Sequence, residues 1–236
     1  MNREWLDKVK KWLKRITIFF FASTVFMVIL YRFIDPPITP LMLIRVFEQW
    51  GDGKSARLKK NWVDLNEMSP NMYRAVMASE DQLFLEHHGF DFESIQKALK
   101  FNQSKSKRRP AKGASTISQQ TAKNVFLWPG RSWLRKGLEV YFTILIEIFW
   151  SKERIMEVYL NVIETGDGIY GADAAAKYYF NSSAKKISKS NAALIAAVLP
   201  NPRKYSAKHP TSYINGRKIW IMHNMDFLAK VKLGDF

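Results

Sequence analysis

An uncharged run of sixteen residues near the N-terminus restricts this chain more than any other feature of its sequence. Ile16 to Tyr31 contains no ionisable Asp, Glu, Lys, Arg or His, and apolar Phe33 and Ile34 follow a single Arg32. About 20 mostly apolar residues span the ~30 Å hydrocarbon core of a bilayer, and a long Arg side chain near the end of the run can reach the interface. The sequence therefore predicts a membrane-spanning helix over residues 16–34.

The charges in front of this run predict its orientation. Six basic side chains precede it, namely Arg3, Lys8, Lys10, Lys11, Lys14 and Arg15. Under the positive-inside rule, residues 1–15 form a cytoplasmic basic tail and everything after Asp35 lies across the membrane. A cleavable signal peptide is the alternative, but no small-x-small cleavage site separates the apolar run from Pro36-Pro37.

The size and charge of the chain fit one main domain with an anionic partner. The sequence has 236 residues and no cysteine, which excludes disulfides and thiolate metal sites. Its 37 Lys and Arg against 21 Asp and Glu give a formal net charge of +16. That excess is compatible with a nucleic acid, a membrane surface or a phosphorylated substrate.

The spacing of apolar residues predicts helices and no convincing strand, hence an all-α fold. Ser69-Pro70 is typical of a helix cap and first helical position, so Glu80 should lie at or just beyond the end of that helix. Later helices are expected from Asp91, from Thr116 to Leu127, from Trp133 to Trp150, from Ser151 to Asn161, up to Phe180, from Ala192 to Leu199 after a cap at Ser188, and from Ser212. In the helix from Asp91, Phe92, Ile95 and Leu99 should share one face. In the helix from Ser212, the apolar positions are Ile219, Met222 and Leu228.

Two further apolar segments bear on the membrane. The run from Val140 to Trp150 is short and contains Glu147, which predicts a buried core helix and not a second span. Leu41 to Trp62 combines apolar residues with a basic stretch from Lys54 to Lys60. This segment either lies on the lipid surface or packs on the domain, and the sequence leaves both open.

The densest group of ionisable residues lies between Ala78 and Asp91. Four carboxylates and two histidines stand there among apolar residues such as Phe84 and Phe90. A carboxylate lodged against apolar side chains has a raised pKa, which suits it to proton transfer near neutral pH, and Glu80 is the first candidate. The alternative is a local charge cluster that merely closes a helix.

Four motifs follow one another between Glu80 and Asn161. They are Glu80-Asp-x-x-Phe84-x-x-His87-x-Gly89, Gly113-Ala-Ser-Thr-Ile-Ser-Gln-Gln120 followed by Lys123-Asn124, Arg135-Lys-x-x-Glu139, and Lys152-x-x-Ile-x-Glu157-x-Tyr-Leu-Asn161. In this order they resemble the biosynthetic peptidoglycan glycosyltransferases, most closely the monofunctional, membrane-anchored members. The resemblance covers Asp64 to about Ser206, and it departs at Ala114, where the family often has a second glycine.

The resemblance implies a fold and a reaction. It implies a lysozyme-like helical lobe over residues 64–236, with a smaller membrane-facing jaw built partly from the linker segment 35–63. The enzyme would join lipid II units into β-1,4-linked glycan strands and release undecaprenyl pyrophosphate at the periplasmic face of the plasma (inner) membrane. Ser-x-x-Lys occurs without Lys-Thr-Gly, so the chain lacks transpeptidase motifs. A partner transpeptidase would cross-link the strands, and division proteins are further expected partners.

The resemblance also assigns roles to residues. Glu80 matches the base that takes the proton from the acceptor sugar's 4-hydroxyl, and Glu139 matches a second essential acid. Glu139 either orients the neighbouring cations or binds a divalent Mg or Mn ion that bridges the pyrophosphate; no other cofactor is implied. The implied substrate-binding residues are Asp81, Phe84, His87, Ser115, Thr116, Gln119, Gln120, Lys123, Arg131, Arg135 and Lys136, with His87 more suited to bracing its motif than to moving a proton.

Two other functions compete with this interpretation. A lysozyme-like glycan-cleaving enzyme would use one Glu as an acid in a similar lobe, but it needs neither a cluster of cations nor a membrane anchor. A non-catalytic, membrane-tethered scaffold would use the net charge of +16 to bind an anionic partner. Nucleic acid is excluded as that partner if the domain lies outside the cytoplasm.

Overall fold

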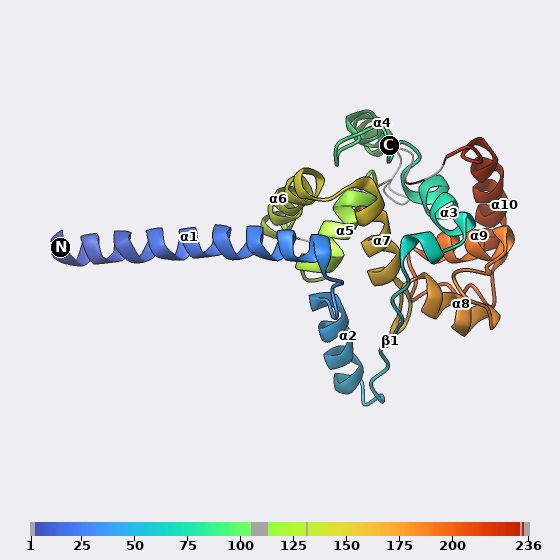
Figure 1. Cartoon of the computed structure of the whole chain (residues 1–236), viewed down its shortest axis with the longest axis horizontal. Coiled ribbons are helices and arrows are strands. Elements are labelled where there is room, and N and C mark those ends of the chain that lie inside the picture. The colour runs from blue at the N-terminus through green and yellow to red at the C-terminus, as the bar shows by residue number, and fades with distance from the viewer. Residues whose placement is uncertain (1–2, 105–112, 131, 232, 234–236) are drawn as a thin grey trace. The chain divides into compact units, whose positions relative to one another are not determined.

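The computed structural model describes residues 3–104, 113–130, 132–231 and 233, and it divides into two compact units, Met1–Asp35 and Pro36–Phe236. The first unit contains helix α1 (Arg3–Phe33), drawn in blue in Figure 1. In the described part of the chain, α1 is the one helix long and apolar enough to cross a membrane, as expected for residues 16–34. The Thr24 hydroxyl donates to the Phe20 carbonyl at 2.8 Å, which satisfies that polar group within the apolar segment.

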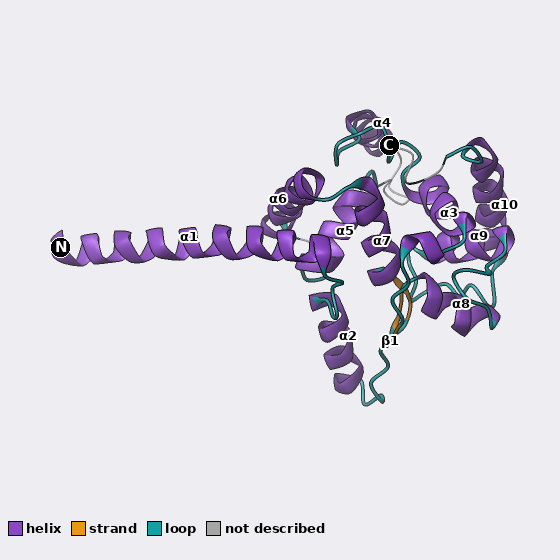
Figure 2. Ribbon diagram, viewed as in Figure 1, coloured by secondary structure: helices purple, strands orange, loops and turns teal. Residues whose placement is uncertain are grey.

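The second unit is predominantly helical, which confirms the predicted fold class (Figure 2). Its elements are α2 (Pro40–Gly51), β1 (Lys59–Lys60), the 3-10 helix η1 (Leu65–Glu67), α3 (Pro70–Glu80), α4 (Phe92–Ser104), α5 (Ile117–Phe126), α6 (Trp133–Phe149), α7 (Lys152–Val162), β2 (Glu164–Gly166), β3 (Ile169–Tyr170), α8 (Ala172–Phe180), α9 (Lys189–Val198) and α10 (Ser212–Phe227).

Two groups of helices build the core. Helix α9 packs against α3, α8 and α10, and α5 packs against α6 and α7 (Figure 1). The alanines of α9, such as Ala193 and Ala196, are fully buried and let the neighbouring helices approach closely. In the second group, Tyr159 and Ile155 of α7 and Ile117 of α5 are fully buried. Burial of large apolar side chains stabilises each by roughly 1.5–3 kcal/mol.

Hydroxyl side chains fix where the helices begin. Ser69, Thr116, Ser132, Ser151 and Ser188 each accept a backbone N–H of the first turn, which confirms the predicted starts of α3, α5, α6, α7 and α9. Helix α3 ends at Glu80, because the backbone of Asp81 leaves the helical conformation. The last residue of α3 is therefore the predicted base.

A three-stranded sheet of order β1-β3-β2 adds to the helices. Strands β2 and β3 are antiparallel, with Glu164 opposite Tyr170, and β1 runs parallel to β3. Gly168 has φ +68, and a Cβ there would lie 2.3 Å from the Arg57 carbonyl oxygen, so the turn requires glycine. Strands of two or three residues are too short to show an alternating pattern, which is why the sequence did not predict them.

The predicted burial of α6 is wrong for one face of the helix. Phe142 and Ile146 are buried as expected, but Trp133, Ile144 and Ile148 are exposed. Helix α6 is covered by α5 and α7 on one side, and two inward positions are taken by the charged residues Arg135 and Glu139. The apolar residues of the opposite face consequently remain exposed.

The predicted apolar faces of α4 and α10 also need correction. In α4, Phe92 and Leu99 are exposed, and Ala98 is the buried residue. In α10, Ile219 is exposed, whereas Ile214, Ile221 and Met225 are buried against α3 and α9. The helix is apolar on more than one side, so its composition alone does not identify the side that packs.

Helix α2 packs on the domain along one face, which was one of the two alternatives left open for Leu41 to Trp62. Leu41 and Met42 are buried in the second unit, whereas Leu43, Phe47 and Trp50 share an exposed face at i, i+4 and i+7 spacing. Pro36–Phe236 forms one compact unit that includes α2. The division into a jaw segment, 35–63, and a larger domain, 64–236, stays a prediction.

Candidate active site

The carboxylate of Glu80 is held by neutral hydrogen-bond donors. The Ser79 hydroxyl donates to Glu80 Oε1 at 2.9 Å, and Gln120 Nε2 donates to Glu80 Oε2 at 3.1 Å. The fully buried Tyr159 donates its hydroxyl to Gln120 Oε1 at 3.1 Å, which turns the amide N–H₂ of Gln120 toward Glu80. Glu80 therefore lies in a polar setting, in contrast to the apolar lodging expected from the sequence, and no basic side chain is paired with it among the described residues.

A second chain of contacts reaches Glu80 from helix α10. Arg217 Nη2 donates to the Ser79 hydroxyl oxygen at 3.0 Å, and the same hydroxyl donates to Glu80. Arg217 therefore acts on Glu80 through Ser79. The sequence analysis did not single out Arg217, because it lies 137 residues beyond Glu80 and in none of the four motifs.

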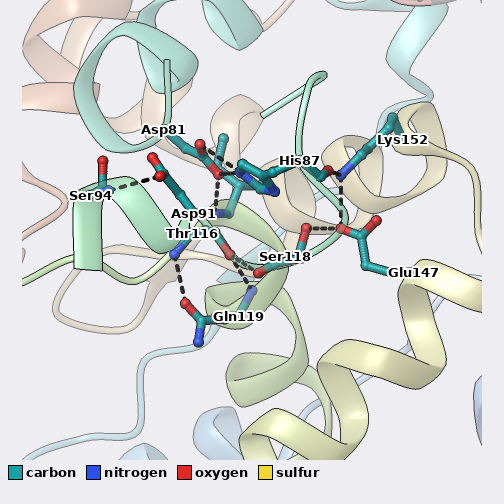
Figure 3. A network of polar contacts seen from close by, with 11 residues as sticks. Asp81, His87, Asp91, Ser94, Thr116, Ser118, Gln119, Glu147 and Lys152 are labelled. Atoms are coloured by element: carbon teal, nitrogen blue, oxygen red, sulfur yellow. Dashed lines mark hydrogen bonds and ion pairs between the residues drawn. The ribbon is translucent and has the colours of Figure 1, made fainter. Parts of the chain in front are cut away.

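Asp81 joins the loop after α3 to the start of α5 (Figure 3). His87 Nε2 lies 2.9 and 3.0 Å from the two Asp81 oxygens, and the backbone N–H of Ile117 donates to Asp81 Oδ2 at 2.9 Å. A carboxylate at the N-terminus of α5 is favoured by the free N–H groups and the helix dipole. Asp81 and His87 thus brace the loop, as the sequence suggested for His87, and Asp81 also lines one of the hollows described below; their predicted role in substrate binding stays a prediction.

Lys152 of α7 fixes the far side of the same loop (Figure 3). Its ammonium donates to the His87 carbonyl at 2.7 Å and to Glu147 Oε1 at 2.8 Å, and Ser118 donates to the same carboxylate oxygen. The Lys152 ammonium also lies 4.7 Å from the ring centre of Phe84, which has no exposed surface. Phe84 therefore packs inside the loop in this structure, and its predicted contact with substrate stays a prediction.

The second motif divides between structure and cleft. Thr116 and Gln119 form a capping box, and the Thr116 hydroxyl donates to the Gly89 carbonyl at 2.7 Å. Both side chains are buried and shape the start of α5, although Thr116 also lines the hollow beside Glu80, and their predicted contact with substrate stays a prediction. Ser115, by contrast, is exposed and lines the cleft, and Gln120 contacts Glu80.

Glu139 lies in surroundings opposite to those of Glu80. Arg135 Nη1 donates to Glu139 Oε2 at 2.7 Å, and the Lys136 ammonium binds Oε1. These residues meet because positions i, i+3 and i+4 of α6 share one helix face. The Glu139 side chain is 4% exposed and that of Arg135 is 11% exposed, so this ion pair is largely removed from water.

Lys123 of α5 connects the two acids electrostatically. Burial lowers the pKa of Lys123 from its ordinary value of 10.5, and the charges of Arg135 and Lys136 lower the pKa further. The carboxylates of Glu139 and Glu80 oppose this shift. Lys123 is thus within electrostatic reach of both acids.

Two neighbouring hollows meet at Ser115. One has a volume of about 380 Å³ and is lined by Lys123, Arg135, Lys136 and Glu139. The other, of about 430 Å³, is lined by Glu80 and by the loop that follows it. Ser115 lines both, so the carboxylate of Glu80 and a group of cations line adjoining spaces of the size that small ligands occupy.

The contacts of Glu139 bear on the expected metal. Both of its oxygens are engaged by cations, and no three His, Asp or Glu side chains gather as a set of metal ligands in the described ranges. Of the two roles that the sequence leaves open for Glu139, its contacts support the one of orienting Arg135 and Lys136. These residues do not by themselves fit a divalent ion.

Comparison with known proteins decides the family. The transglycosylase family matches residues 46–226, which include all four motifs and the contacts described above. The chain belongs to the transglycosylase family. This confirms the resemblance that the order of the motifs predicted.

Relatives within the transglycosylase family match nearly the whole chain. A biosynthetic peptidoglycan transglycosylase of Bacteroides thetaiotaomicron is 54% identical over 225 residues, which are 95% of this chain and 90% of that protein. Proteins of the same name from Bdellovibrio bacteriovorus and Xanthomonas campestris are 51% and 49% identical, over 95% and 89% of this chain and 88% and 85% of their own length. The similarity thus extends beyond the matched transglycosylase region.

Most of the predicted site residues of this transglycosylase chain lie together. The two hollows are lined by Glu80, Asp81, Ser115, Thr116, Lys123, Arg135, Lys136 and Glu139. Arg131 lies outside the described residues. The hollow lined by Lys123, Arg135 and Lys136, called here the cation-rich hollow, is also lined by Arg45 and Glu164. These two residues were not predicted, because the contact between Arg45 of α2 and Glu164 of β2 depends on tertiary structure.

Proposed function

We propose that this transglycosylase is a peptidoglycan glycosyltransferase that polymerises lipid II into β-1,4-linked glycan strands and releases undecaprenyl pyrophosphate. The observation that carries the proposal is a carboxylate with neutral partners, Glu80, beside a hollow lined by Lys123, Arg135 and Lys136. The names of the relatives, biosynthetic peptidoglycan transglycosylases, support the same reaction.

Glu80 is the base in this reaction. It takes the proton of the acceptor sugar's 4-hydroxyl while the hydroxyl oxygen forms a bond to the anomeric carbon of the donor. The bond from that carbon to the pyrophosphate oxygen breaks, so an α-linked donor gives a β-linked product without a covalent enzyme intermediate. Ser79 and Gln120 hold both carboxylate oxygens by hydrogen bonds, which orients the base toward the hollow.

The cations stabilise the departing pyrophosphate. Negative charge grows on its oxygens as the sugar–oxygen bond breaks, and fixed positive groups offset that charge without reorganisation. Glu139 holds Arg135 and Lys136 at adjacent positions of one helix face. The fork of Arg135 suits a phosphate, while Lys123 supplies a point charge between this group and Glu80.

The membrane placement follows from helix α1. This N-terminal apolar helix fits a single-pass anchor that keeps the enzyme near a lipid-linked substrate. The basic residues before it favour a cytoplasmic N-terminus and a catalytic domain on the periplasmic side of the inner membrane. A separate transpeptidase would cross-link the product strands, and division proteins are further candidate partners.

The test is incubation of the purified full chain in detergent with labelled lipid-linked disaccharide-pentapeptide, followed by separation on a gel. We expect a ladder of glycan strands that needs no second protein. Cleavage of preformed glycan without a ladder would support the hydrolytic alternative instead. If neither activity appears, the non-catalytic scaffold becomes the better account.

A further inference from the structure

Three residues that line the cation-rich hollow each carry a buried polar atom that has no partner among the described residues. The atoms are Asn124 Nδ2, Arg135 Nε and Glu164 Oε1. Their residues are 2%, 9% and 6% exposed, so solvent does not satisfy these atoms freely. A buried polar atom without a hydrogen bond costs roughly 1–3 kcal/mol, and a ligand that supplies the missing bonds removes this cost.

The three atoms differ in what they require of a ligand. Asn124 and Arg135 offer N–H donors, which suit phosphate oxygens. Glu164 offers a carboxylate oxygen, which needs a donor and repels a phosphate. A pyrophosphate alone therefore satisfies two of the three atoms, whereas a sugar pyrophosphate also carries hydroxyl or amide N–H groups.

Glu164 is fixed so that one oxygen stays available. Arg45 Nε donates to Glu164 Oε2 at 3.3 Å, and the pairing of β2 with β3 places Glu164 opposite the buried Tyr170. Burial raises the pKa of Glu164, and the neighbouring charges of Arg45 and Arg203 oppose this shift. Glu164 thus holds an unpartnered acceptor, Oε1, in the wall of a hollow otherwise suited to anions.

We propose that Glu164 is a specificity-determining residue that accepts a hydrogen bond from the sugar of the glycosyl pyrophosphate and disfavours the polyprenyl pyrophosphate product. The inference rests on the proposed function, because it names the substrate group that one wall of the same hollow recognises. Arg45, which also lines the hollow, acts as a positioning residue for Glu164 through its contact with Oε2.

The experiment compares the affinities of two probes, lipid-linked disaccharide pyrophosphate and undecaprenyl pyrophosphate, for the full chain in detergent. In Glu164→Ala, the disaccharide probe should bind about tenfold more weakly, and undecaprenyl pyrophosphate should bind as well as before or better. In Glu164→Gln, removal of the charge should lower the ratio of the two affinities in the same direction. An unchanged ratio in both variants would overturn the proposal.

Glu48→Gln is the matched control. Glu48 is the other acid bonded to Arg45, at 2.7 Å, and its side chain is 41% exposed and does not line the hollow. If Glu164 merely restrains Arg45, both probes should change together in the Glu164 variants. If the ratio falls in those variants and stays at the wild-type value in Glu48→Gln, the effect belongs to Glu164.

Failure of this inference is distinguishable from failure of the proposed function. Wild-type protein that makes a glycan ladder but shows no Glu164-dependent ratio contradicts the inference alone, whereas absence of the ladder contradicts both. Should neither Glu164 variant fold, donor analogues lacking one sugar hydroxyl or amide N–H serve the same purpose with wild-type protein. One analogue should bind about tenfold more weakly than its parent, and equal affinity across the series overturns the proposal.

Discussion

The two acids of the site lie in opposite surroundings. Glu80 ends helix α3, and its oxygens accept hydrogen bonds from the neutral side chains of Ser79 and Gln120. Glu139 lies within helix α6, and its oxygens bind Arg135 and Lys136. A carboxylate with neutral partners can accept a proton without breaking an ion pair. The same fold therefore places a carboxylate suited to accept a proton at one end of the site and a carboxylate that holds cations at the other.

Removal of Glu139 should have the largest effect on stability. Glu139→Ala leaves the guanidinium of Arg135 buried without its carboxylate, which lowers the free energy of unfolding by about 3–5 kcal/mol. Urea denaturation of the full chain in detergent measures the change. Glu93→Ala is the control, because it removes an exposed ion pair of the same i,i+4 spacing, with Lys97, and should cause no measurable loss. Equal effects of the two changes would show that Glu139 does not hold the cations.

The loss of the Asp81 carboxylate beside Glu80 should have the next largest effect on stability. Asp81→Asn weakens the charged hydrogen bonds to His87 and to the N–H of Ile117, which lowers the free energy of unfolding by about 1.5–3 kcal/mol. Thermal or urea unfolding measures it, with Glu86→Gln as the control, since Glu86 is exposed in the same loop. If the two variants are equally stable, Asp81 does not join the loop to α5.

A smaller effect is expected when Glu80 loses one of its two neutral donors. Ser79→Ala leaves Gln120 in place, so the rate of glycan synthesis should fall by up to about tenfold, while substrate affinity stays unchanged. Single-turnover rates and equilibrium binding separate the two quantities. Ser104→Ala, an exposed hydroxyl at the end of α4, should leave both at the wild-type value. A loss of affinity in Ser79→Ala would indicate that Ser79 binds substrate.

The smallest expected effect is a shift in the pH at which activity is lost on the alkaline side. Burial lowers the pKa of Lys123 below 10.5, so Lys123 loses its charge at a lower pH than an exposed lysine. The destabilising cost of burying its charge is present below the folded pKa and disappears as the pH rises toward 10.5. Lys123→Arg stays charged throughout, and its alkaline loss of activity should move to higher pH. An unmoved alkaline limb in a pH–rate profile would exclude Lys123 as the group that titrates.

The positions of both acids could be predicted from local sequence. Ser69-Pro70 fixes the start of α3 and hence its end at Glu80, and helical spacing brings Arg135, Lys136 and Glu139 to one face of α6. Helix caps and motif order are local properties of the sequence, so they can be recognised without a structure. The membrane-spanning helix could be predicted for the same reason.

The partners of these acids were less predictable. Arg217 reaches Ser79 from α10, and Arg45 reaches Glu164 from α2, across 138 and 119 residues of sequence. Such pairings depend on how the helices pack, and helix packing cannot be deduced from a single sequence. The burial of Phe84 and Asp81 was not predicted for a related reason. The sequence of a motif does not show whether a polar or aromatic residue braces the site or faces a ligand.

The most direct test of the account compares Glu80→Gln with Glu139→Gln for turnover and for affinity toward lipid-linked disaccharide. Glu80→Gln keeps the size and hydrogen bonds of the side chain but removes its basicity, so turnover should fall by about 10²–10⁴-fold while affinity is retained. Glu139→Gln should lower affinity as well, because Arg135 and Lys136 lose the charge that holds them. Wild-type turnover in Glu80→Gln would contradict the assignment of Glu80 as the base.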